Sequence, residues 1–222
     1  MKYSKINTLF KRDEKNRIIL GDYCQPEFAY LEGNKWECTE KIDGTNIRIE
    51  INPDGCGNYG LFFKGRTDEA QIPKHLWDKL VELFPSQKVQ ELFINPDQEY
   101  PGPQITIFGE GYGVKIQKGG NYISNGVGFI LFDVRIGNWW LKREALEEVA
   151  KQLEIPIVSL IGYMTIPEAI EFVRNGFKST IAENKDYDAE GLVLKTPTGL
   201  LARNGERLIT KIKTQDFRQL GL

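Results

Sequence analysis

The sequence contains a single histidine, His75, among its 222 residues. A His-based zinc site, a Ser-His-Asp triad and a Cys-His dyad all depend on histidine, and no further candidate exists for them. His75 itself lies in "IPKHLWDKLVELF", where Leu76, Leu80, Leu83 and Phe84 recur at helical spacing. We therefore expect His75 to lie on the surface, near the start of a helix.

Cysteine is also scarce, and Cys24, Cys38 and Cys56 form no CxxC pair. A chain of 222 residues can bury a sizeable core without disulfides, so we expect these three thiols to be reduced, as in a cytosolic protein. The N-terminal residues lack the apolar region of a secretory signal. No apolar run is long enough to span a membrane, and we expect no membrane partner.

A strong excess of one charge is missing as well, since the formal net charge is −2. This value argues against a globally basic nucleic-acid coat. Residues 195–222 differ from the average, because six basic residues face two acidic ones and give a net charge of +4. Such a local basic face can hold phosphates, although a solvated edge is the alternative.

Alternating and helical patterns together predict one α+β domain over residues 1–222 with largely antiparallel sheets. Ile47, Ile49 and Ile51 alternate with polar residues, which is the period of a strand. Thr165 and Glu168 have the spacing of a capping box at a helix start. Further strands are predicted at 61–66, 103–110, 128–136, 155–162, 189–196 and 207–214, helices at 74–84, 142–154 and 165–176, and a turn at 52–60.

Polar residues interrupt the stretch "WECTEKIDGTNIRIEI" (residues 36–51) at the junction of two strand-like runs. Asp43 and Gly44 alone would suit the tight turn of a hairpin. A hairpin does not explain why polar residues recur at the ends of other predicted strands. These residues are Arg66, Glu110, Asp133, Glu190, Lys211 and Lys213.

Lys211 and Lys213 are two residues apart in a predicted strand, so their side chains project from one face. Two ammonium groups on one face repel each other and need an anion nearby. A phosphate group would satisfy them, and so would Glu110 or Glu190. The alternative is a purely structural ion cluster.

The ordered series "KIDGTN", "FFKGRT", "IFGEGYG", "FILFDV", "EGLVLK" and "ITKIK" resembles the nucleotidyltransferase motifs of covalent ligases and mRNA capping enzymes. The resemblance extends from Glu40 to Lys213. DNA ligases and capping enzymes usually carry arginine at the position of Asn46, and the "GTN" found here is similar to RNA ligase 2-like enzymes of phage type. The resemblance implies an ATP-grasp-like ligase adenylation fold around a nucleotide pocket.

The resemblance also implies that Lys41 attacks the α-phosphate of ATP and forms lysyl-AMP. An attacking lysine must be neutral, so its pKa must fall by roughly three units from about 10.4. Desolvation and the neighbouring charges of Lys211, Lys213 and Mg²⁺ or Mn²⁺ can lower it. The resemblance also implies roles for the other residues. Arg66 would contact the ribose or the RNA 5′-phosphate, Glu110 would bind the ribose or a metal, Phe132 would stack on adenine, and Glu190 would bind a metal. Lys211 and Lys213 would bind the α-phosphate, Thr45 and Asn46 would position the nucleotide and a metal-bound water, and Glu40 would help to frame the base. Phe132 as a core residue and Asp43 as a turn residue are the structural alternatives.

We thus expect an ATP-dependent RNA ligase that adenylylates an RNA 5′-phosphate and seals it to a 3′-OH, in nicked duplexes or at single-strand ends, as in RNA repair. A minimal DNA ligase or guanylyltransferase is an alternative, against which Asn46 argues. An inactive nucleotide- or RNA-binding module is another, against which the intact set of charged residues argues. We expect no appended OB-fold or helical domain. Either a partner or the basic face of Arg203, Arg207 and Arg218 would then help to bind RNA, or the protein would work mainly as an adenylyltransferase on nicked or pre-activated ends. The expected location is the cytoplasm, or the host cytoplasm for a phage-encoded protein.

Overall fold

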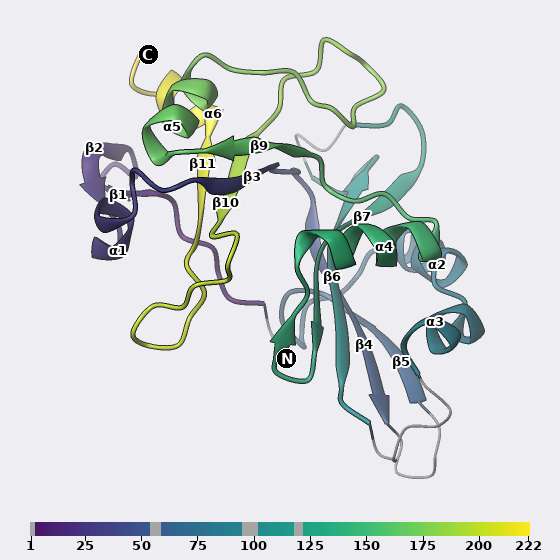
Figure 1. The fold of residues 1–222 in the computed structure, drawn as a ribbon. Helices are drawn as coiled ribbons and strands as arrows, with labels where there is room; N and C mark the ends of the chain where they lie inside the picture. Colours follow the sequence, from purple (N-terminus) through teal and green to yellow (C-terminus); the bar gives the residue numbers. More distant parts are fainter. Residues whose placement is uncertain (1–2, 54–58, 95–101, 118–121) are drawn as a thin grey trace. The chain divides into compact units, whose positions relative to one another are not determined.

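The computed structural model describes residues 3–53, 59–94, 102–117 and 122–222, and the chain divides into two compact units (Figure 1). Unit 1 comprises Met1–Tyr3 and Asp43–Ile157, and unit 2 comprises Ser4–Ile42 and Val158–Leu222. Both units combine helices with antiparallel sheet, which confirms the α+β class. The prediction of one nucleotidyltransferase domain over residues 1–222 stays a prediction. Cys56 and most of the predicted turn at 52–60 lie outside the described residues.

Unit 1 is built on a sheet in which every neighbouring pair of strands is antiparallel. The strand order is β5-β4-β6-β7-β8. The long central strands carry the candidate residues Asn46, Glu110 and Phe132, so this sheet positions these three residues. The bounds of the five strands of this sheet are Thr45–Pro53 (β4), Tyr59–Lys64 (β5), Ile105–Gly113 (β6), Val127–Ile136 (β7) and Trp139–Trp140 (β8).

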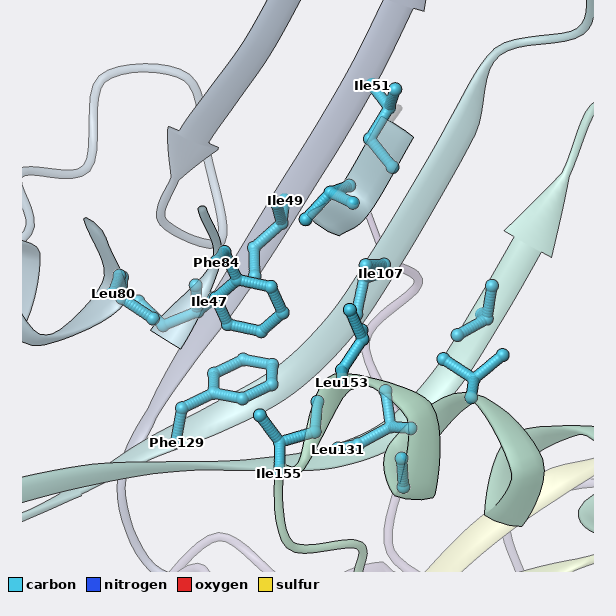
Figure 2. Close-up of a cluster of buried hydrophobic side chains, with 14 of the residues drawn as sticks. Ile47, Ile49, Ile51, Leu80, Phe84, Ile107, Phe129, Leu131, Leu153 and Ile155 are labelled. Atoms are coloured by element: carbon cyan, nitrogen blue, oxygen red, sulfur yellow. The ribbon is translucent and has the colours of Figure 1, made fainter. Parts of the chain in front are cut away.

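One face of this sheet forms the core of unit 1, because the isoleucines of β4 alternate with polar residues and all point to that face. Helices α2 (Lys74–Leu83), α3 (Ser86–Phe93) and α4 (Arg143–Leu153) contribute to the same core. Figure 2 shows Ile47, Phe84 and Phe129 packed together there. The helices thus cover one face of the sheet, and Asn46, Glu110 and Phe132 lie on the other.

Unit 2 contains the sheet β11-β10-β3-β9, also antiparallel throughout, and the two-stranded ribbon β1-β2. Its core gathers Phe28, Trp36, Ile166, Leu192 and Phe217, which come from three helices and two strands. The bounds are Phe10–Arg12 (β1), Ile18–Tyr23 (β2), Pro26–Tyr30 (α1), Trp36–Glu40 (β3), Leu160–Met164 (β9), Ile166–Arg174 (α5), Gly191–Lys195 (β10), Ile209–Lys213 (β11) and Thr214–Arg218 (α6).

The predicted capping box at the start of α5 is confirmed. The Thr165 Oγ1 atom accepts the backbone N–H of Glu168 at 3.3 Å, and the Glu168 carboxylate accepts the backbone N–H of Thr165 at 2.7 Å. Lys35 pairs with the same carboxylate at 2.6 Å. Hydrogen bonds from Lys35 and Thr165 lower the pKa of Glu168 to about 2.

The hairpin explanation of Asp43 and Gly44 is wrong. β3 pairs with β9 and β10, whereas β4 pairs with β5 and β6, so the strands on either side of Lys41 belong to different sheets. Glycine is needed at position 44 for another reason. A Cβ atom there would overlap the carbonyl oxygen of Gly111 on β6.

The predicted strand at 155–162 is also displaced. The strand that forms is β9 at Leu160–Met164, while Ile157 makes only an isolated parallel bridge with Leu131. Burial of Ile155 in the core of unit 1 explains the apolar run without a strand. The patterns did not predict β1, β2, α1, α3, β8 and α6, which are short or lie on the surface. None of the helices in the described ranges has the length and apolar character needed to cross a bilayer.

Candidate active site

Lys41 directly follows β3 in unit 2, and its side chain is 19% exposed. The backbone N–H of Lys41 donates to the carbonyl oxygen of Gly191 at 2.9 Å, which continues the pairing of β3 with β10 beyond the end of the strand. The Nζ atom lies 2.5 Å from Oε2 of Glu190 and 3.3 Å from the carbonyl oxygen of Ile42. The amine is therefore held in one position and partly shielded from water.

Glu190 joins two of the predicted lysines. Its second carboxylate oxygen, Oε1, lies 2.6 Å from Nζ of Lys213. The Glu190 side chain is 18% exposed, so both ion pairs lie in a partly desolvated setting. Glu190, one of the two carboxylates proposed as counter-charges for the lysine pair, thus contacts Lys213.

The backbone around Glu190 explains how its carboxylate reaches both amines. Gly191 has φ +151°, and a Cβ atom there would overlap the carbonyl oxygen of Ile212 on β11. The backbone N–H of Thr214 donates to the carbonyl oxygen of Glu190 at 3.0 Å. This close approach of two strands, which only glycine permits, places Glu190 between the ends of β3 and β11.

Lys211 lies on β11 opposite Val193, on the same face as Lys213. Burial, with the nearby charges of Lys41 and Lys213, lowers the pKa of Lys211 to about 8. Within the described part of the chain, no carboxylate lies within ion-pair distance of its Nζ atom. Lys211 is therefore a partly desolvated cation beside the Lys41–Glu190–Lys213 cluster, as an anion-binding site requires.

Glu40, the residue before Lys41, is only 1% exposed. Its carboxylate accepts hydrogen bonds from Ser179 Oγ at 2.5 Å, Thr180 Oγ1 at 2.5 Å and the backbone N–H of Thr180 at 2.8 Å. These bonds tie the loop at 179–180 to the end of β3. Ser179 and Thr180 carry no motif in the sequence, so this contact could not be anticipated.

In unit 1, Asn46 on β4 and Glu110 on β6 lie directly opposite each other in the strand register. Both project from the face opposite the isoleucine core. The Oδ1 atom of Asn46 is buried and has no hydrogen-bond partner among the described residues. Buried polar atoms are almost always paired, so this oxygen is an acceptor that the described residues leave available.

Phe132 projects from the same face of this sheet, since it lies two residues after Ile130, which pairs with Glu110, and it forms part of a β-bulge in β7. Phe108 pairs with Asp133 and Gly109 with Leu131, so Phe132 is the extra residue without an opposite partner. It is half-buried and absent from the core, contrary to the alternative of a simple core residue. The ring of Tyr3 packs against it edge-on at 5.1 Å, and Tyr3 Oη donates to Asp133 Oδ2 at 2.8 Å.

The other sequence-predicted residues of unit 1 are less constrained. Arg66 is exposed and lies beyond the end of β5, two residues after the observed strand. Thr45 begins β4 opposite Gly111, and the backbone N–H of Asp43 donates to Tyr122 Oη at 2.8 Å. Sequence reasoning missed Tyr3, whose contact with Asp133 spans 130 residues. His75 lies on the surface in the first turn of α2, as predicted.

Metal ligands do not gather in a cluster within the described ranges, since no three His, Cys, Asp or Glu side chains come together there. Glu190 and Glu110 are the two carboxylates that the sequence suggested, and each belongs to a different unit. Magnesium usually binds through one or two carboxylates together with substrate phosphates. A single carboxylate such as Glu190 therefore fits a metal that arrives with a nucleotide.

A family model shows the family of this chain, and solved structures show its fold. A family model described as RNA ligase matches residues 34–213. A structure of a Naegleria gruberi RNA ligase variant with ATP and Mn has a TM-score of 0.67 at 17% identity, over 99% of this chain and 58% of that one. A second, also with ATP and Mn, has a TM-score of 0.66 at 18% identity, over 99% and 62%.

A third structure, the Naegleria gruberi RNA ligase with PPi, has a TM-score of 0.64 at 18% identity. This match covers 98% of this chain and 63% of that one. The chain therefore spans about three fifths of the length of these structures. A sequence comparison with curated proteins gives no match. The similarity confirms the predicted nucleotidyltransferase-type fold with its antiparallel sheets.

Proposed function

This chain belongs to the RNA ligase family, and on that premise we propose that it uses ATP to form lysyl-AMP on Lys41 and then joins RNA ends. One observation carries the proposal. A partly buried lysine contacts a single carboxylate that also binds Lys213, and a third lysine with a pKa lowered to about 8 lies beside them. This arrangement combines a nucleophile, a proton acceptor and cations for a phosphate.

In the first step, the lone pair of Lys41 Nζ attacks the α-phosphorus of ATP. A P–N bond forms, the bond between the α-phosphorus and the bridging oxygen breaks, and pyrophosphate leaves. Nζ, protonated in its ion pair, must lose one proton before the attack and a second once the P–N bond has formed. Oε2 of Glu190 at 2.5 Å is the nearest carboxylate that can accept the first, and the second passes to solvent. Lys211 and Lys213 stabilise the negative charge that develops on the α-phosphate oxygens.

In the following steps, an oxygen of the RNA 5′-phosphate attacks the same phosphorus and takes over the AMP, which restores the Lys41 amine. The 3′-OH of the other RNA end then attacks the activated 5′-phosphate, and AMP leaves. Lys211 and Lys213 serve these steps by the same electrostatic means. RNA as the acceptor, in a nicked duplex or at single-strand ends, is the part of the proposal that follows from the family.

Mg²⁺ or Mn²⁺ bound with ATP would neutralise phosphate charge, and Glu190 is the residue of unit 2 that would contact it. Structures of a Naegleria gruberi RNA ligase with ATP and Mn support this choice of nucleotide and of a divalent cation. Glu190 would then share its carboxylate between the cation and the lysines. The loss of one lysine contact would free an amine for reaction.

The roles of the unit 1 residues remain part of the proposal. The unpaired Oδ1 atom of Asn46 supports a role in positioning the nucleotide, and the half-exposed ring of Phe132 supports stacking on adenine. Glu110 lies opposite Asn46 and would contact the ribose or a metal. Thr45 and Arg66 keep the roles that the family resemblance implies, and so does Glu40, although its carboxylate oxygens already accept hydrogen bonds.

Incubation with each of the four α-labelled NTPs, followed by a denaturing gel, tests the proposal. Label from ATP should become attached through a bond that is acid-labile and alkali-stable, as a phosphoramidate is. Lys41→Ala should abolish it, and so should Lys41→Arg, since arginine stays protonated. Lys151→Ala, an exposed lysine of α4, is the matched control and should label normally. Full labelling of Lys41→Ala would show that the nucleophile is another residue.

A further inference from the structure

A pocket of about 510 Å³ lies in unit 2, on the side of β11 that faces the N-terminal segment. Its walls come from residues 5–16, Cys24, the two lysines of β11 and residues 215–219. The volume lies within the range of roughly 300–1,000 Å³ that is usual for ligand sites. Its residues beyond Lys211 and Lys213 have no role in the reaction described above.

The N-terminal segment is held in place by the edge of β11. The backbone N–H of Leu9 donates to the carbonyl oxygen of Lys211 at 3.0 Å, and the N–H of Lys211 donates to that of Asn7 at 3.2 Å. Thr8 forms a parallel bridge with Lys211. The edge of the sheet is thus extended, and one wall of the pocket is built on paired backbone rather than on a free loop.

The charge of the pocket is strongly positive. Lys5, Lys11, Arg12, Lys211 and Lys213 line it, whereas Asp216 is the acidic residue in its wall. Arg12 binds both carboxylate oxygens of Asp216, at 2.9 and 2.8 Å, so the negative charge of the wall is already neutralised.

Two of these cations form no ion pair with any described residue. Lys11 pairs with Asp22 at 2.8 Å and Lys213 with Glu190 at 2.6 Å. In contrast, neither Lys5 nor Lys211 has an ion pair within the described part of the chain. The charge of Lys5 is close enough to help lower the pKa of Lys211. Unpaired, mutually repelling cations in one pocket are stabilised by a bound anion.

The remaining lining narrows the chemistry of that anion. Besides the charged residues, the walls carry mainly amide and hydroxyl groups, from Asn7, Thr8, Asn16, Gln215 and Gln219. Cations and neutral hydrogen-bond donors suit phosphate oxygens and sugar hydroxyls better than the flat face of a base. Lys211 and Lys213 belong both to this pocket and to the cluster around Lys41, so a bound phosphate would lie next to the reaction centre.

We propose that this pocket binds phosphate groups of the RNA strand during ligation, with Lys5 as a contact residue that no motif indicates. The choice of RNA rests on the proposed function. The shared chemistry, a phosphate anion, has a second source in free pyrophosphate. The pocket would hold the strand by its backbone, so binding would not depend on base sequence.

Fluorescence anisotropy with a labelled 5′-phosphorylated RNA oligonucleotide, without ATP, tests the proposal on the full chain. Lys5→Ala should weaken binding by about three- to tenfold at low salt and reduce the slope of log K against log salt by about 0.7, the value for one single-strand phosphate contact. Lys5→Arg should retain binding. Lys151→Ala removes the same charge from an exposed site on α4 and should bind like the wild type.

Four outcomes test the two proposals, with thermal melts as the check on folding. Weaker RNA binding by Lys5→Ala, restored in Lys5→Arg, supports the proposal. Unchanged RNA binding by Lys5→Ala overturns it. Unchanged RNA binding with a lost ability of pyrophosphate to compete would assign the pocket to free polyphosphate instead, which also overturns the RNA assignment. A wild type that binds RNA through Lys5 but takes no label from ATP would overturn the ligase proposal and leave the pocket intact.

Discussion

The Nζ atom of Lys41 lies 2.5 Å from Oε2 of Glu190, although 149 residues separate them in the chain. An amine that forms an ion pair carries a proton, and a protonated amine has no lone pair with which to attack. The proposed reaction therefore requires that Lys41 Nζ transfer its proton to Glu190, or that the ion pair between them open, when ATP binds. The Lys41–Glu190 contact is thus the relationship on which the chemistry depends.

Substitution of Glu190 tests that dependence. Glu190→Gln keeps the size and one hydrogen bond but removes the charge, so we expect at least a tenfold loss of lysyl-AMP formation. Some stability should be lost as well, because Lys41 and Lys213 are left partly buried without their counter-charge, so labelling is compared below the melting temperature of the variant. The matched control is Glu206→Gln, an exposed carboxylate of the same unit, which should label normally. A large loss of stability with normal labelling would favour the structural ion cluster instead.

Lys211 should make stability depend on pH. Burial, with the charges of Lys41 and Lys213, lowers its pKa from 10.5 to about 8, so between those values the unfolded chain binds more protons than the folded chain. The free energy of unfolding should therefore rise with pH across this window, and the charged lysine costs stability below it.

Lys211→Met should abolish that rise and increase stability at pH 7 by about 1 kcal/mol, after allowance for partial exposure. Denaturant unfolding at pH 7 and at pH 9.5 gives both values. Lysyl-AMP formation should fall sharply in the same variant, since the cation that stabilises the phosphate is lost. If Lys211→Met were less stable than the wild type at pH 7, the charged form of Lys211 would not be destabilising in the folded chain.

Gly191→Ala should destabilise the protein through a clash rather than through backbone conformation alone. A Cβ atom at this position overlaps the carbonyl oxygen of Ile212, and we expect a loss of about 2 kcal/mol or more. Gly199→Ala is the control, because Gly199 also has a positive φ, +68°, but has nothing within 4 Å of the added atom. Its loss should stay near 1 kcal/mol. Equal losses in urea unfolding would refute the steric explanation.

Asn46→Ala should lower the affinity for ATP without lowering the stability of the fold. Its Oδ1 atom is buried and accepts no hydrogen bond from the described residues, so removal of the side chain should leave the melting temperature unchanged or slightly higher. ATP affinity, measured by calorimetry, should fall at least severalfold. Asn52→Ala, on the same face of β4, removes an amide that already accepts from Gln104 and should leave ATP affinity unchanged. Normal ATP affinity of Asn46→Ala would remove Asn46 from the proposed site.

Lysyl-AMP formation and nick sealing should differ in their dependence on salt concentration. Raising salt from about 50 to about 200 mM should reduce nick sealing far more than lysyl-AMP formation, because RNA is held through exposed phosphate contacts. A nick with an RNA 3′-OH end should be sealed better than an all-DNA nick. Equal salt dependence of the two steps would argue against electrostatic RNA binding, and better sealing of DNA would favour a DNA ligase.

Local patterns in the sequence were sufficient for much of the fold. The alternation of Ile47, Ile49 and Ile51 predicted β4, and the spacing of Thr165 and Glu168 predicted the start of α5. Both depend on neighbours a few residues away, where side-chain direction follows from backbone geometry. The motif order likewise identified the family.

Tertiary structure decided what depends on distant partners. Asp43 and Gly44 suited a hairpin locally, but Trp36–Glu40 pairs with Gly191–Lys195 instead of with the next strand. Sequence left open whether Glu110, Glu190 or a phosphate would balance Lys211 and Lys213, and the fold brings Glu190 to Lys213. The pairing of Asn7 and Leu9 with Lys211, which builds the basic pocket, has no local signal, because strand edges accept any backbone. Backbone pairing over long separations depends on the packing of the whole unit, and side-chain periodicity alone does not encode it.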